Sequence, residues 1–89
     1  MSKLSRKATV LNAKVVELLQ KQVEMEAHAS ATYLAMSSWC DAHGFTKSAA
    51  FFLEHSSEER GHMLKIFHFL NENGVRAFSP EVKNIQQEY

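Results

Sequence analysis

Apolar residues recur at alternating steps of four and three along two long stretches of the chain, which is the period of one face of an α-helix. We predict helices over about residues 10–42 and 46–73. The face of the first stretch carries Val15, Leu19, Gln22, Glu26, Ala29, Tyr33, Met36 and Cys40. The face of the second carries Ala49, Phe52, Ser56, Glu59, Met63, Ile66 and Leu70. No period-two pattern competes, so we predict an all-α fold without a strand between residues 15 and 70.

The helix-ending and helix-capping residues around the two stretches predict how the helices are joined. Gly44 is a natural left-handed residue for the end of the first helix, and Gly74 has the same place after the second. Thr46 is a candidate N-cap for the second helix, and Ser5 or Thr9 for the first. The connection is about three residues long, and so short a loop forces two adjacent, antiparallel helices. The expected unit is therefore a helical hairpin.

A hairpin of two helices cannot bury all of these apolar residues alone. Several side chains are expected to stay partly exposed to solvent in a single hairpin: Val15, Leu19, Met36, Phe52, Ile66 and Leu70. A second apolar stripe on the first helix is formed by Leu11, Leu18, Met25, Thr32 and Trp39. At about 25 cal/mol per Å² the lost burial is several kcal/mol, comparable to the whole stability of a small domain. We therefore expect a two-fold pair of hairpins that rebuilds a four-helix bundle, while the second stripe is free to meet a further subunit.

The composition narrows the class of protein. The 89 residues suit one domain, 1–89, and ten acidic residues balance ten basic ones, which gives no attraction for nucleic acid. Residues 1–9 form a basic tail. Residues 75–89 lose the helical pattern and form a connecting segment, in which Ser79-Pro80 predicts either extended chain or a turn. A single cysteine excludes an internal disulfide, and no apolar run suits a signal peptide or a membrane span. These features favour a cytoplasmic protein.

The chemistry-bearing residues lie in the middle of the two predicted helices. Glu59 and His62 are three residues apart and so share a helix face. Glu26 lies 18 residues before Gly44 and Glu59 lies 15 after it, so both are about 25 Å from the turn and can meet across the hairpin. A carboxylate on a buried face must be protonated, paired or metal-bound, and Arg60 is an alternative partner for Glu26. Two carboxylates with one imidazole suit iron or manganese, with zinc as a competitor.

Other candidates have two interpretations each. Glu58 is either an outer metal ligand or a solvated side chain next to Glu59. Tyr33, two turns beyond Glu26, is either a core tyrosine or a redox neighbour of the metal. The remaining histidines show no ligand spacing and are more typical of a surface; they are His28, His43, His55 and His68.

Residues 24–39, 44–45 and 55–63 resemble the bacterial non-haem ferritins, through a Glu-x6-Tyr spacing from Glu26 to Tyr33 and a Glu-Glu-x-x-His-Met run that starts at Glu58. The resemblance covers about residues 11–89. Ferritins are four-helix bundles that form hollow cages, oxidise iron(II) at a di-iron centre and store the ferric mineral. By this resemblance Glu26 is a terminal ligand of the first iron, Glu59 a bridging carboxylate and His62 an imidazole ligand. Tyr33 lies beside the centre, and Glu58 belongs to an accessory third iron site.

The resemblance implies half of a ferritin subunit, with the first two long helices and the start of the crossover. It implies a ferroxidase that uses dioxygen or hydrogen peroxide, in a homodimer or a cage of the 24-subunit type. Two hairpins related by a dyad would supply a Glu from each of two helices and Glu-x-x-His from each of the other two, which completes a symmetric di-iron site like that of a bacterioferritin. The alternative is a helical self-assembly module, or an inactive fragment, without chemistry of its own.

Overall fold

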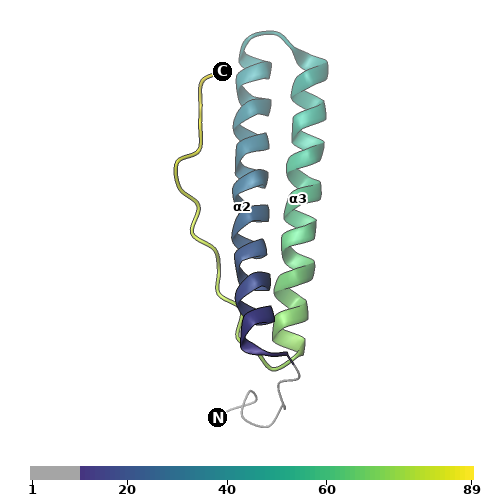
Figure 1. The fold of residues 1–89 in the computed structure, drawn as a ribbon. Helices are drawn as coiled ribbons and strands as arrows, with labels where there is room; N and C mark the ends of the chain where they lie inside the picture. The colour runs from purple at the N-terminus through teal and green to yellow at the C-terminus, as the bar shows by residue number, and fades with distance from the viewer. Residues whose placement is uncertain (1–10) are drawn as a thin grey trace.

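The computed structural model describes residues 11–89, which form two long helices and an extended C-terminal segment. Helix α2 spans Ala13–Ala42 and helix α3 spans Thr46–Glu72, and the two lie antiparallel, side by side along their whole length (Figure 1). No strand occurs between residues 11 and 89. The predicted all-α helical hairpin is confirmed. The basic tail over residues 1–9, with the candidate caps Ser5 and Thr9, lies outside the described residues.

The start of α2 and the capping residue of α3 differ from the prediction, while the start of α3 and the ends of both helices agree with it. Asn12 caps α2, because its side-chain oxygen accepts a hydrogen bond of 2.9 Å from the backbone N–H of Val15. Thr46 was the wrong choice for α3, since it is already the first helical residue and Phe45 occupies the cap position without a side-chain bond. Gly44 and Gly74 have φ of 82° and 80°, the left-handed conformation that glycine adopts at no steric cost.

The loop between the helices is closed by a Schellman motif. The N–H of Phe45 bonds to the carbonyl of Cys40 at 2.8 Å, and the N–H of Gly44 bonds to the carbonyl of Asp41 at 3.1 Å. The same pair of bonds follows α3, around Gly74. Two of the orphan carbonyls at each helix end are therefore satisfied by local backbone, which fixes where the chain turns.

The predicted inner face of α3 is correct. In α2, the face that packs against α3 is rotated slightly about the helix axis from the predicted face. In α3, every seventh residue is buried: Ala49, Ser56, Met63 and Leu70. In α2 the buried positions include Val23 and Ser37, whereas the predicted Gln22, Ala29 and Met36 lie beside the contact at intermediate exposure. Glu26, Tyr33 and Cys40 were placed correctly on the inner half of the helix.

Serines that form hydrogen bonds between the two helices account for this difference in α2. Ser30 Oγ donates to the carbonyl of Ser56 at 2.8 Å, and Ser56 Oγ donates to the carbonyl of Ser30 at 2.7 Å. Ser37 Oγ donates to the carbonyl of Ala49 at 2.6 Å. Apolar periodicity gives no weight to Ser30 and Ser37, although their hydroxyls donate to backbone carbonyls of α3 across the interface.

The hydrophobic core lies at the end of the hairpin away from the loop. Its buried members are Val23, Ala27, Met63, Leu70 and Ala77. Leu70 was expected to be partly exposed to solvent, but it is fully buried. Val75, at the start of the C-terminal segment, packs on this cluster and helps to cover it.

Leu70→Ala should destabilise the hairpin by about 2–5 kcal/mol, since it leaves a cavity in a well-packed cluster. Leu53→Ala is the matched control, because Leu53 lies on the same helix and is 54% exposed. Thermal or denaturant unfolding measures both. Equal losses in the two variants would mean that the core has been placed at the wrong end of the hairpin.

Residues 75–89 are extended, which is one of the two predicted alternatives, and run back along α2 towards the loop (Figure 1). The Gln20 side chain holds this segment with two bonds, donating to the carbonyl of Phe78 at 2.9 Å and accepting from its N–H at 3.1 Å. At the far end the Tyr89 ring lies 6.3 Å from the Trp39 ring, edge to face. Neither α2 nor α3 is long and apolar enough to cross a membrane.

Candidate metal centre

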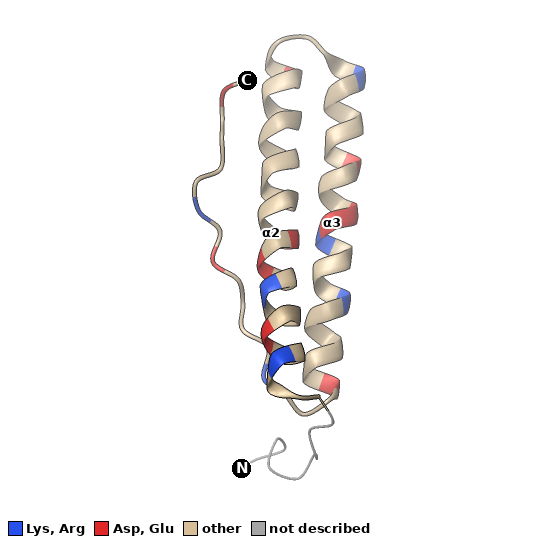
Figure 2. Ribbon diagram, viewed as in Figure 1, with Lys and Arg blue, Asp and Glu red and all other residues tan. Residues whose placement is uncertain are grey.

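The three predicted metal ligands converge halfway along the hairpin. Glu26 comes from α2, Glu59 and His62 come from α3, and one ligand atom of each lies within 4.8 Å of the others. His62 Nδ1 is 3.3 Å from Glu26 Oε2 and 3.4 Å from Glu59 Oε1. Acidic segments of α2 and α3 lie at a similar level in Figure 2. Glu26 and Glu59 were predicted to lie at similar distances from the loop, and this position along the two helices brings the three side chains together.

The two carboxylates are shielded, while the imidazole is open to one side. The side-chain exposures are 15% for Glu26, 23% for Glu59 and 56% for His62. This open side is formed by the residues that share a helix face with Glu26 on α2 and with His62 on α3, and we call it the site face. Large apolar side chains share these helix faces, including Tyr33 and Met36 on α2 and Phe69, seven residues after His62, on α3.

The crowding of the carboxylates changes the acidity of Glu59. A side-chain hydrogen bond with Glu26, loss of water and the negative charge of Glu26 raise the pKa of Glu59, and His62 partly opposes this shift. Two carboxylates held this close repel each other unless a proton or a cation lies between them. The site therefore favours a positive charge at its centre.

Glu59→Gln should stabilise the metal-free protein at neutral pH relative to the parent. Because the folded state holds the Glu59 proton more tightly than the unfolded state does, the contribution of Glu59 is fully present below its unfolded pKa and is lost as the pH rises through the raised pKa. The difference between Glu59→Gln and the parent should thus grow in favour of the variant as the pH rises from about 4 to 7.

Glu58→Gln removes the same charge from the neighbouring, exposed position and is the control. Its stability relative to the parent should show no such rise with pH. Chemical denaturation across this pH range, in the presence of a chelator, measures both differences. A flat profile for Glu59→Gln would contradict the close approach of the two carboxylates.

The donor set fits a divalent metal ion of the iron or manganese type. Carboxylate oxygens suit these ions, and an imidazole nitrogen adds affinity for transition metals. Within residues 11–89, the three residues of this cluster each offer one ligand atom, so further coordination positions stay open to other ligands. The arrangement can bind a cation and leave it accessible to a small molecule.

The other predicted site residues are not part of this cluster. The Tyr33 ring stacks on Phe52 at 6.0 Å and meets His55 edge to face at 5.5 Å, in an aromatic group next along the site face. Glu58 is exposed and does not converge with the three ligands. Their assigned roles stay predictions.

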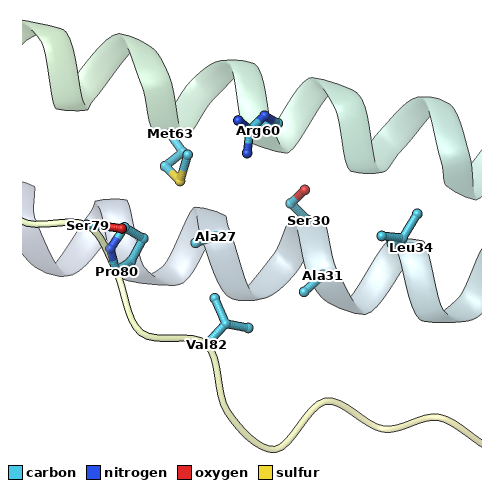
Figure 3. A pocket seen from close by; sticks show the side chains of 9 residues that line it. All are labelled: Ala27, Ser30, Ala31, Leu34, Arg60, Met63, Ser79, Pro80 and Val82. Carbon is cyan, nitrogen blue, oxygen red and sulfur yellow. The ribbon is translucent and has the colours of Figure 1, made fainter.

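Arg60 does not pair with Glu26, which removes that alternative. It lines a separate cavity between the helices and the C-terminal segment, together with Ala27, Met63 and Pro80 (Figure 3). In the described part of the chain, Arg60 makes no ion pair. The carboxylate of Glu26 is therefore left to His62, Glu59 and one further residue.

That further residue is Gln22, which shares the predicted helix face of Glu26 but was not predicted as its partner. Its Nε2 donates to Glu26 Oε1 at 2.8 Å. The spacing of four residues on a helix is the signal that could have revealed this contact, because side chains at this spacing touch.

The sequence profile of the ferritin-like domain matches residues 16–88, which is most of the chain and includes the three converging residues. The chain belongs to the ferritin family. Among similar proteins, a probable bacterial non-heme ferritin-like protein of Haemophilus influenzae is 41% identical over 80 residues, covering 90% of this chain and 48% of that protein. A bacterial non-heme ferritin of Campylobacter jejuni is 38% identical with the same coverage.

Solved ferritins share the fold. The ferritin of Chlorobium tepidum superposes with a TM-score of 0.84 at 36% identity, covering 90% of this chain and 49% of that one. An open-pore ferritin from Archaeoglobus fulgidus gives 0.83 at 29% identity, covering 89% and 48%. The ferritin chain described here spans about half the length of the relatives it matches.

Proposed function

We propose that this chain binds iron(II) at Glu26, Glu59 and His62 and takes part in its oxidation and storage. The observation that carries the proposal is the convergence of these ligand atoms within 4.8 Å in a chain of the ferritin family. The resemblance to bacterial non-heme ferritins over 80 residues supports the same reading. Iron is the substrate in this scheme, and zinc is a competitor for the same donors.

The residues act by placing negative charge where iron gains positive charge. Glu26 and Glu59 stabilise iron(III) more than iron(II), which favours oxidation. Two iron(II) ions each give up one electron. Dioxygen takes both electrons with two protons and becomes hydrogen peroxide, or hydrogen peroxide takes them with two protons and becomes two water molecules. Tyr33, close along the site face, is proposed as a redox neighbour, and Glu58 as the outer ligand of a third iron.

Two metal ions need more ligands than one hairpin offers, and we propose that a second copy supplies them. A dyad across the site face would bring together two Glu26 side chains and two Glu59/His62 pairs, the full ligand set of a di-iron bundle. The site is incomplete without this partner.

The shape of the chain supports this proposal. Its radius of gyration is 16.4 Å, whereas a compact domain of this length would have about 12 Å. Its accessible surface is 6350 Å², against about 5,300 Å² for a compact protein of 10.1 kDa. Apolar side chains account for part of the excess, and Phe69 on the site face is 46% exposed. Larger cages would use other surfaces, such as the exposed Leu18 and Met25 of the second stripe.

Mixing the protein with iron(II) in air tests the function. We expect ferric iron to form faster than in buffer alone, with a rate that saturates as the iron concentration rises. Added zinc should slow the reaction by competition. A folded oligomer that neither binds iron(II) nor speeds its oxidation would instead favour the assembly module without chemistry.

A further inference from the structure

Gln22 has an unusual place for an amide, since it lies half-buried on α2 one turn before Glu26. Its Nε2 is 2.8 Å from Glu26 Oε1, which is a normal hydrogen bond, whereas His62 approaches the other oxygen, Oε2, at 3.3 Å. The carboxylate can only accept, so the amide must present its nitrogen. The two oxygens of Glu26 are thus divided between two partners.

We propose that Gln22 is a positioning residue that holds Glu26 as a one-oxygen ligand. The inference rests on the proposed metal role of Glu26 and adds the mode in which that carboxylate binds. With Oε1 held by Gln22, Oε2 is the oxygen that lies next to His62, and it is the one that would bind the metal ion.

The physical reason lies in the freedom of a glutamate side chain. The terminal torsion of glutamate is broad, so a carboxylate without a second partner can rotate and offer both oxygens to one ion. Two-oxygen ligation would fill a coordination position that the proposed centre needs for a second carboxylate. Partners of this kind, which orient a ligand without touching the metal, typically contribute 10–100-fold to metal affinity.

Cobalt(II) titration of the whole chain tests the role, because cobalt(II) does not oxidise readily and its visible spectrum reports its coordination. Gln22→Leu keeps the size of the side chain and removes the donor, and Gln22→Asn keeps an amide that is too short to reach. Both should bind cobalt(II) about 10–100-fold more weakly than the parent, with a changed visible spectrum. The metal-free stability of Gln22→Leu should stay close to that of the parent, which separates positioning from packing.

Gln20→Leu is the matched control, since it makes the same change on the same helix at a residue that contacts Phe78 instead. It should keep the affinity and the spectrum of the parent. Parental cobalt binding in Gln22→Leu, together with loss of binding in Glu26→Ala, would overturn the role of Gln22 alone. A parent that does not bind cobalt(II), or a Glu26→Ala variant that binds it normally, would overturn the metal site itself and the inference with it.

Discussion

Glu59→Ala and His62→Ala are each expected to abolish saturable iron(II) binding and to reduce iron oxidation to the rate in buffer. Each change removes one of the three converging ligand atoms, and the loss should exceed the 10–100-fold that a mere orienting partner contributes. The metal-free protein should remain folded. Glu59→Ala should even be more stable, because it removes a shielded carboxylate that is crowded by Glu26.

Glu54→Ala is the control for these variants. It removes a carboxylate from the same helix at an exposed position outside the cluster, so any general effect of charge on iron attraction would appear in it as well. Anaerobic iron(II) titration gives the affinity, and stopped-flow absorbance gives the oxidation rate. Parental rates in both ligand variants would show that the cluster is not where iron is oxidised.

Phe69→Glu is expected to convert the proposed dimer into monomers. Phe69 is 46% exposed in the single hairpin, so the change costs the hairpin little by itself. In the dimer, however, it would place an unpaired charge against the apolar site face, which costs several kcal/mol. Each 1.4 kcal/mol is about a tenfold change in the dissociation constant, so dimers should be lost at micromolar concentration.

Leu53→Glu introduces the same charge on the same helix at a residue that is 54% exposed and lines a hollow with Ser37 and Ala49, away from the site face. It should leave the dimer intact. Analytical ultracentrifugation over a range of concentrations measures both variants, and the thermal midpoint of the parent should rise with concentration. A parent that stays folded at monomer mass at every concentration would contradict the pairing.

The sequence was sufficient for those features that depend on local geometry. The ends of both helices were predictable because Gly44 and Gly74 adopt a backbone conformation that other residues avoid. The meeting of Glu26 with Glu59 and His62 followed from helical spacing and a short loop. Both predictions use the regular rise of a helix, which tertiary contacts change little.

Features that depend on particular side-chain contacts were missed. The inner face of α2 is set by Ser30 and Ser37, whose hydroxyls bond to the carbonyls of α3, and a search for apolar periodicity does not detect them. The path of the C-terminal segment depends on Gln20, which is 58 residues away from its partner Phe78. The four-residue spacing of Gln22 and Glu26 allows their contact, but the hydrogen bond itself depends on two rotamers, which the sequence does not specify.

The most direct test of the proposed centre is native mass spectrometry of the protein loaded with iron(II) without oxygen. The ligand set requires two chains for two ions, so each pair of 10.1 kDa chains should carry two iron ions, whether the pairs stay separate or join into larger assemblies. Glu59→Ala should give the same pairs without iron. Folded single chains, or pairs whose iron content is the same with and without Glu59, would contradict a di-iron centre shared between two hairpins.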